Sequence, residues 1–344
     1  MHRALTMTTL FALVALASAC EKKTDSTTTT SASQPATSSA VLPKTETATA
    51  PAPAAASGTA ATATGTGKKA NAPIATWKDV GLATPESVLH DEVSDVYLVS
   101  NINGQPLEAD GNGFISKLSP GGTVETLKWI EGGKNKVTLN APKGLAILGD
   151  VLYVSDLDTV RMFDRNTGAP KGEVKVPGAT FLNDVVATSD GRVLVSDSGM
   201  KAAAKGFEPT GTDAVYQIDK NKKLTPLAKG KELAGPNGLY PVGDKVWVAS
   251  FASNELYALD PKGKKVDSQK LPKGSLDGIV GLQGGDLLVA SWEAGAVYRG
   301  KPGGDFKSII EDVKSPADIG YDTKRARVLV PLFEKNEVHA YELQ

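Results

Sequence analysis

The sequence predicts an all-β fold, a six-bladed β-propeller, over residues 74–344. A unit made of an apolar strand, a tight turn and a second strand of the Val-x-Val type recurs six times in this part of the chain. Equivalent positions are residues 86, 143, 183, 237, 277 and 317, and their spacings of 57, 40, 54, 40 and 40 residues are close to the length of a four-stranded blade. The 35 Gly and 20 Pro of the chain suit many short strands joined by turns.

The six copies define the expected strands in order. The first two strands of each blade are predicted at residues 85–101, 142–156, 182–197, 236–250, 276–291 and 316–332. Turn dipeptides such as Gly149-Asp150 and Gly243-Asp244 separate the two strands, which is typical of hairpins. The last copy leaves room for only three strands, whereas residues 74–80 resemble a strand. We therefore expect the N-terminal strand to complete the sixth blade and close the ring.

The first 20 residues are typical of an export signal. A short basic segment with Arg3 precedes an apolar run, residues 4–16, that is too short to span a bilayer comfortably. Ala-Ser-Ala at residues 17–19 then leads into Cys20 and resembles a bacterial lipobox, so residues 1–20 are predicted to be a lipoprotein signal peptide with lipidation at Cys20. An ordinary signal peptide with an incidental cysteine is the alternative. The predicted location is the cell envelope, lipid-anchored, at the outer membrane facing the periplasm or the cell exterior, because Glu21 is not the aspartate that favours inner-membrane retention.

Residues 21–73 are rich in Ser, Thr, Ala and Pro and are predicted to form a disordered linker, because they cannot bury enough apolar surface to offset the entropy of ordering.

The net charge is -1, with 38 basic and 39 acidic residues, so the composition indicates no nucleic-acid partner. The single cysteine excludes an intrachain disulfide. The expected partners are a small-molecule substrate or ligand and a membrane, through the lipid anchor.

One position in each blade is expected to carry the chemistry. The residue at the start of each innermost strand points at one common site in a propeller, and here these residues are Glu86, Lys143, Asn183, Asn237, Asp277 and Ala317. Two carboxylates and two carboxamides offer hard oxygen ligands, so Glu86, Asn183, Asn237 and Asp277 predict a divalent metal, Ca²⁺ above all. Zinc and copper are disfavoured because the propeller region holds only His90 and His339 and no cysteine.

Simpler interpretations exist for the same residues. Asn237 in Pro-Asn-Gly and Asp277 before Gly278 could each be turn residues. Asp184 and Asp318 lie one residue beyond the site position and are expected to support the ligands. Asp156 and Asp197 end second strands and are expected to accept hydrogen bonds between blades.

The motifs Pro85-Glu86, Asn183-Asp184, Gly235-Pro236-Asn237-Gly238 and Leu276-Asp277-Gly278 occur in that order. With them, residues 74–344 resemble the senescence-marker-protein-30, gluconolactonase and regucalcin-like six-bladed propellers, with paraoxonases and diisopropyl fluorophosphatase as more distant relatives. The resemblance implies that the matching Glu, Asn and Asp bind a divalent metal, usually Ca²⁺. It also implies that Asn183 helps to hold substrate and that Asp277 acts as catalytic base or nucleophile.

The chain departs from that pattern at the substrate. Phe181 stands where sugar-lactonase members commonly place an arginine, and Lys143 is an unusual cation that could bind an anionic substrate. The substrate-binding candidates are therefore Lys143, Asn183 and Phe181, and a sugar-lactone substrate does not follow. Two insertions after second strands, residues 101–113 and 198–213, are expected to cover the mouth of the site.

Two classes of function follow. The first is an exported metal-dependent hydrolase of a lactone or other ester, gluconolactonase-like, with Asp277 as its catalytic residue. The alternative is a non-catalytic lipoprotein whose propeller binds a small molecule or a protein.

Overall fold

The computed structural model describes residues 72–204 and 206–343. The predicted signal peptide, the lipidation site at Cys20 and the predicted linker up to residue 71 lie outside the described residues. Among the described residues, no helix has the length and apolar character needed to cross a membrane.

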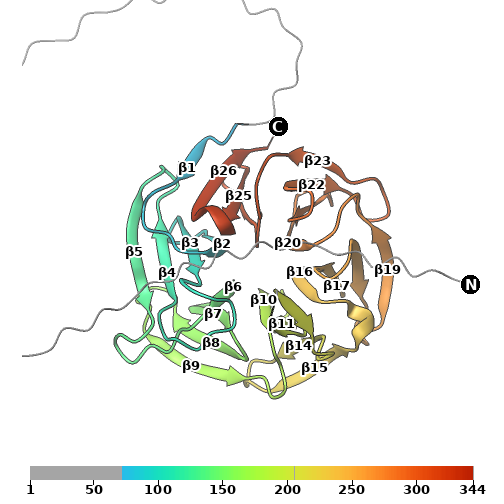
Figure 1. Cartoon of the computed structure of the whole chain (residues 1–344), viewed down its shortest axis with the longest axis horizontal. Coiled ribbons are helices and arrows are strands. Elements are labelled where there is room, and N and C mark those ends of the chain that lie inside the picture. Colours follow the sequence, from blue (N-terminus) through green and yellow to red (C-terminus); the bar gives the residue numbers. More distant parts are fainter. Residues whose placement is uncertain (1–71, 205, 344) are drawn as a thin grey trace, which may run out of the picture. The chain divides into compact units, whose positions relative to one another are not determined.

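Six four-stranded antiparallel sheets surround a central channel, so the predicted six-bladed propeller is confirmed (Figure 1). From the inner to the outer strand, the first three blades are β2 (Pro85–Asp91), β3 (Val96–Asn101), β4 (Phe114–Leu118), β5 (Val124–Glu131); β6 (Pro142–Leu148), β7 (Val151–Asp156), β8 (Thr159–Asp164), β9 (Pro170–Lys175); and β10 (Leu182–Ala187), β11 (Val193–Asp197), β14 (Ala214–Ile218), β15 (Leu224–Lys229).

The other three blades are β16 (Pro236–Val242), β17 (Lys245–Ser250), β18 (Glu255–Leu259), β19 (Lys265–Lys270); β20 (Leu276–Gly281), β21 (Leu287–Ser291), β22 (Ala296–Gly300), β23 (Lys307–Ile310); and β24 (Gly320–Asp322), β25 (Arg327–Leu332), β26 (Glu337–Glu342), β1 (Ala75–Trp77). The described residues also hold a small hairpin, β12 (Met200–Ala202) and β13 (Phe207–Pro209), and two 3₁₀ turns, η1 (Lys231–Leu233) and η2 (Phe333–Lys335).

The N-terminal strand closes the ring, as the sequence predicted. Strand β1 pairs antiparallel with β26 in the register Ala75↔Ala340 to Trp77↔Val338 and becomes the outer strand of the sixth blade. The Trp77 indole is fully buried, donates a hydrogen bond to the carbonyl of Thr123 at 3.2 Å and packs edge-on against Tyr97. The two ends of the propeller chain therefore share one sheet, and β26 is not left as an exposed edge.

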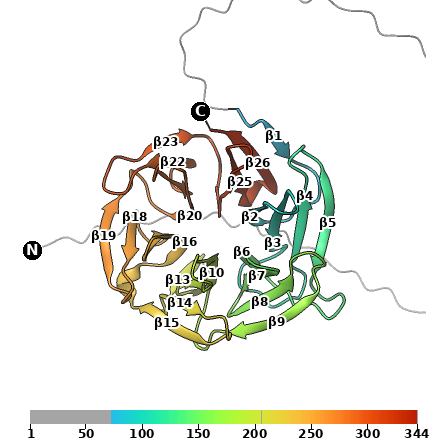
Figure 2. The ribbon, with the colours of Figure 1, turned by 180° about the vertical axis from the view of Figure 1, so that it is seen from behind.

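The hydrophobic core is a ring rather than a single centre. Six clusters of buried apolar side chains in the described residues each join two neighbouring blades; one cluster, for example, joins Val160 of the second blade to Leu182 and Val193 of the third. The Val-x-Val strands supply these contacts because alternate side chains of a blade face opposite neighbours. The inner strands β2, β6, β10, β16 and β20 lie around the centre of the ring, so the residues at their starts meet there (Figure 2).

Serine residues of the second strands fix the inner strands against each other. The Ser155 hydroxyl donates to the carbonyl of Asn183 in the next blade, and the Ser196 hydroxyl donates to that of Asn237 at 2.8 Å. Asp156 and Asp197 act differently from expectation. Each accepts backbone N–H groups from the loop that enters the inner strand of its own blade, Ala141 at 2.8 Å and Phe181 at 2.9 Å respectively. The prediction of inter-blade bonds for these two aspartates is therefore wrong.

Candidate functional site

Five of the six predicted site positions are the second residue of an inner strand: Glu86, Lys143, Asn183, Asn237 and Asp277. The sixth, Ala317, lies just before β24 and contributes no polar group. The five polar side chains are buried, with exposed fractions of 1 to 6%. The strands that carry them, β2, β6, β10, β16 and β20, surround the central opening (Figures 1 and 2).

A repeated β-bulge presents these residues to the channel. In β2 the pairing passes from Pro85↔Asn101 to Val88↔Val99, so two residues of β2 oppose the single Ser100 of β3. The same register shift occurs at the same place in β6, β10, β16 and β20. A bulge leaves its extra residue out of the ladder and re-aims the side chain. The fold thus releases one side chain per blade towards the channel at each of these five strands.

The four predicted metal ligands share a second property. Glu86 Oε2, Asn183 Oδ1, Asn237 Oδ1 and Asp277 Oδ1 are each buried and have no hydrogen-bond partner among the described residues. A buried oxygen without a donor is costly and uncommon in folded proteins. Four such oxygens, one from each of four predicted ligands, fit a hard cation that takes oxygen ligands.

The carboxyl groups also interact electrostatically across the channel. Burial raises the pKa of Glu86 well above its ordinary value, and the charges of Asp277 and Asp318 raise it further, whereas Lys143 lowers it. Burial likewise raises the pKa of Asp277, as does Asp318, while neighbouring donors on Trp292 and Asn237 lower it. Glu86 in the first blade and Asp277 in the fifth are therefore close enough to sense each other's charge.

Asp184 and Asp318 bond to the inner strands next to the proposed ligands, and their support of the ligands themselves stays a prediction. Asp184 accepts backbone N–H groups from Val185 at 2.6 Å and from Leu239 of the next blade at 2.7 Å. Asp318 accepts the Ser87 hydroxyl and so ties the sixth blade to the first. Gly278 permits the approach of Asp318, because a Cβ there would lie 2.7 Å from Asp318 Oδ1.

Lys143 lies at the site but is not a free cation. Its Nζ donates to the carbonyls of Pro106 at 3.0 Å and Ala141 at 3.1 Å, and it lies 4.7 Å from the centre of the Phe181 ring. Burial lowers its pKa to about 8, while the carboxylates of Glu86 and Asp156 act in the opposite direction. Two of its three N–H donors are thus used by the protein.

Both insertions lie over the site, as expected. The first reaches Lys143 through the Pro106 carbonyl. The second supplies Ser198, whose hydroxyl accepts from Asn183 Nδ2 at 3.2 Å, and the β12–β13 hairpin, whose Phe207 packs edge-on against Phe181 at 5.6 Å between ring centres. Phe181 is therefore covered by its own blade's insertion and has an exposed fraction of 8%.

Among the described residues, no three His, Cys, Asp or Glu side chains gather in a metal-binding cluster. The proposed ligands at the channel are two carboxylates and two carboxamides, so they do not form a cluster of that kind. Three aromatic residues near the same opening, Phe251, Trp292 and Phe333, were not singled out from the sequence. The available signal was their position, directly after the second strands of three consecutive blades.

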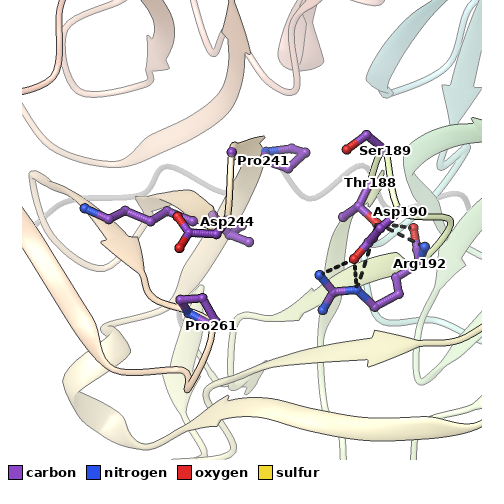
Figure 3. Close-up of a pocket in the computed structure, with 10 residues that line it drawn as sticks. Thr188, Ser189, Asp190, Arg192, Pro241, Asp244 and Pro261 are labelled. Carbon is purple, nitrogen blue, oxygen red and sulfur yellow. Dashed lines mark hydrogen bonds and ion pairs between the residues drawn. The ribbon is translucent and has the colours of Figure 1, made fainter.

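A groove of about 410 Å³ lies at the other end of the inner strands, between the turns of the third and fourth blades (Figure 3). Its charged side chains are engaged locally: Arg192 pairs with Asp190 at 2.9 Å, and Lys245 pairs with Asp267 at 2.6 Å. It lacks the orphaned oxygens of the channel site and holds none of the predicted site residues. The candidate functional site is therefore the channel rather than this groove.

The fold and the site together define a six-bladed propeller with a polar, oxygen-lined site in its central channel. Residues 119–319 match the family described as SMP-30/Gluconolactonase/LRE-like region. Because the match covers more than half of the 344-residue chain, the chain belongs to this family, and it is a lactonase-like propeller. The resemblance found in the motifs is thereby confirmed.

Several solved structures share the fold. A gluconolactonase from Xanthomonas campestris is 18% identical, with a TM-score of 0.59, over 76% of this chain and 87% of that chain. A virginiamycin B lyase from Staphylococcus aureus is 12% identical, with a TM-score of 0.54, over 78% of this chain and 98% of that one. A chain of a nidogen/laminin complex is 16% identical, with a TM-score of 0.51, over 64% and 76%. These likenesses show the fold alone, and no curated protein sequence matches the chain.

Proposed function

We propose that this protein is an exported, divalent-metal-dependent hydrolase of a lactone or another ester, with Ca²⁺ as the metal. The observation that carries the proposal is the set of four orphaned, buried oxygens on Glu86, Asn183, Asn237 and Asp277. Ca²⁺ takes six to eight oxygen ligands, so such a set leaves positions for water and substrate. Membership of the gluconolactonase family supports the reaction class, and the signal-like sequence of residues 1–20 supports export.

In this proposal Glu86, Asn183, Asn237 and Asp277 hold the cation, which when bound supplies Lewis-acid polarisation of the substrate carbonyl. Asp277 is the base. Its carboxyl group is buried at the site, beside donors on Trp292 and Asn237, and its carboxylate takes up the water proton. The water oxygen bonds to the carbonyl carbon as a water proton passes to Asp277. The carbon–oxygen bond to the alkoxide then breaks and the alkoxide takes up the proton, so that a lactone yields a hydroxy acid.

The remaining residues orient the substrate. Lys143 is fixed by two backbone carbonyls, and its third N–H is the donor we assign to an acceptor oxygen of the substrate. Its rigid support limits the entropy lost on binding. Asn183 Nδ2 is held by Ser198, which fixes the direction of the Asn183 amide oxygen.

Non-catalytic binding of a small molecule or protein is a second candidate function. Phe181 favours it, because an apolar ring replaces the donor that sugar-lactonase members use to hold their substrate. Calcium binding without hydrolysis of any ester would distinguish this binding function from the hydrolase.

The experiment is hydrolysis of a panel of lactones and aryl esters, with calcium and after chelation, by wild type and Asp277→Asn. We expect calcium-dependent turnover that Asp277→Asn lowers about 10²–10⁴-fold, the usual contribution of a general base. Asp244→Asn is the matched control, because Asp244 is an exposed aspartate in the turn that follows β16, at the other end of that strand from Asn237. Turnover that survives chelation, or that Asp277→Asn leaves intact, would contradict the proposal.

A further inference from the structure

Three aromatic residues occupy one repeat position in consecutive blades. Phe251, Trp292 and Phe333 directly follow the second strands β17, β21 and β25. Their backbone N–H groups bond to carbonyls two residues before the site position of the same blade: Gly235 at 2.9 Å, Ser275 at 3.0 Å and Ser315 at 3.1 Å. All three residues are therefore anchored where the inner strands of blades four to six begin, at the end of the channel that holds Asp277.

The three rings are in contact with one another. Phe251 and Trp292 pack edge to face with ring centres 5.6 Å apart, and Trp292 and Phe333 lie 5.1 Å apart at 53°. Each residue is partly exposed rather than buried. We name these three residues the aromatic wall. Such a group offers rigid apolar contact area at small entropic cost.

The wall covers only one half of the rim. The equivalent positions in blades one to three are Ile102, Leu157 and Ser198, and the two insertions lie over that half through Pro106 and the β12–β13 hairpin. A substrate that reaches Asp277 would thus have protein loops on one side and the aromatic wall on the other.

Trp292 carries a second signal of its own. Its indole Nε1 is buried and has no hydrogen-bond partner among the described residues. Buried tryptophan N–H groups normally find an acceptor, since leaving one unpaired costs free energy. The backbone N–H of Trp292 bonds to the carbonyl of Ser275, two residues before Asp277, so Trp292 lies at the end of the strand that carries the proposed base. An oxygen atom of a bound ligand would satisfy its indole N–H.

We propose that the aromatic wall binds an alkyl or aryl substituent of the substrate while Trp292 Nε1 donates to a substrate oxygen. This inference rests on the proposed hydrolase function and narrows its substrate class to lipophilic lactones or esters. Hydroxyl groups of a polyhydroxylated substrate would lie unpaired against the rings of the wall.

The test compares binding of two non-hydrolysable probes to the calcium-loaded full chain by calorimetry: pyrrolidin-2-one and its 5-octyl derivative. We expect the octyl lactam to bind at least 10-fold more tightly, since its methylene groups leave water and pack against the rings of the wall. Trp292→Ala should remove most of that preference. Trp292→Phe should keep the preference but weaken both lactams, because it retains the ring and lacks the donor.

Trp129→Ala is the matched control, since Trp129 lies on the outer strand β5, away from the channel, and should leave the preference intact. Equal binding of the two lactams, no binding of the octyl lactam to wild type, or a preference that survives Trp292→Ala would overturn the aromatic wall. Octyl selectivity without hydrolysis of any ester would support binding at the aromatic wall and contradict the proposed hydrolase function. Hydrolysis with no alkyl selectivity would support the hydrolase and contradict binding at the aromatic wall.

Discussion

Asp318 shows how a single residue can be essential to a site it does not line. Asp318 follows Ala317 in the sequence, and its carboxyl group accepts a hydrogen bond from the Ser87 hydroxyl. Its charge also raises the pKa of Glu86, one of the proposed ligands. Burial raises the pKa of Asp318 from the ordinary 3.8 to about 7, and the bond from Ser87 opposes that shift. The carboxyl groups of Glu86, Asp184 and Asp277 are shifted in the same direction by the same burial.

These shifts predict how stability depends on pH without divalent metal. Between about pH 4 and 7 the folded Asp318 keeps a proton that the unfolded chain has lost, so the folded state binds more protons and the free energy of unfolding falls as pH rises. Asp318→Asn cannot ionise and should show a shallower fall. Denaturant unfolding from pH 4 to 8 in a chelating buffer measures both slopes. Equal slopes in wild type and Asp318→Asn would contradict the assignment.

At the scale of elements, the sequence revealed the strands better than their irregularities. The repeat phase placed Glu86, Asn183, Asn237 and Asp277 at one position because each is the second residue of its copy. The bulge that turns these side chains inward depends on pairing between two strands, for example Val88↔Val99, and a residue pattern does not encode that register.

The contacts made by the two insertions also could not be predicted from the repeat pattern. That Pro106 supplies a carbonyl to Lys143 follows from the path of a long loop, and no repeat constrains that path. The aromatic wall was missed for a different reason. Phe251, Trp292 and Phe333 do share a repeat position, but it lies in the loop after the second strand, and Ile102, Leu157 and Ser198 occupy it in the other blades, so the repeat shows no aromatic pattern.

Strand β1 leads to a prediction at this scale. Trp77→Ala should lower the free energy of unfolding by about 3–5 kcal/mol, the usual cost of removing a large buried aromatic side chain, because Trp77 is fully buried and joins β1 to Tyr97 and Thr123. Val93→Ala is the control: Val93 is 77% exposed, and its change should stay within about 0.5 kcal/mol. Chemical denaturation measures both. If the two variants unfold alike, β1 does not hold the ring closed.

At the scale of the whole propeller, the described residues form a ring in which each hydrophobic cluster joins two neighbouring blades and the inner strands meet at one polar centre. Structures with this fold include a gluconolactonase, a lyase and a chain of a nidogen/laminin complex, so the ring itself does not decide the chemistry. The groups at the centre of the ring decide it instead, and in this chain they are four orphaned oxygens, a lysine bonded to two backbone carbonyls and an aromatic wall.

The most direct test of this account is scanning calorimetry of wild type, Asp277→Asn and Asp244→Asn, with calcium and with a chelator. Calcium at 100 times its dissociation constant should stabilise the fold by about 2.7 kcal/mol, so chelation should lower the melting temperature of wild type and of the Asp244→Asn control. Asp277→Asn removes one of the two ligand carboxylates, so its calcium-dependent shift should be much smaller at the same concentration. A wild-type melting temperature that calcium does not change would contradict the metal site on which the proposed hydrolase depends.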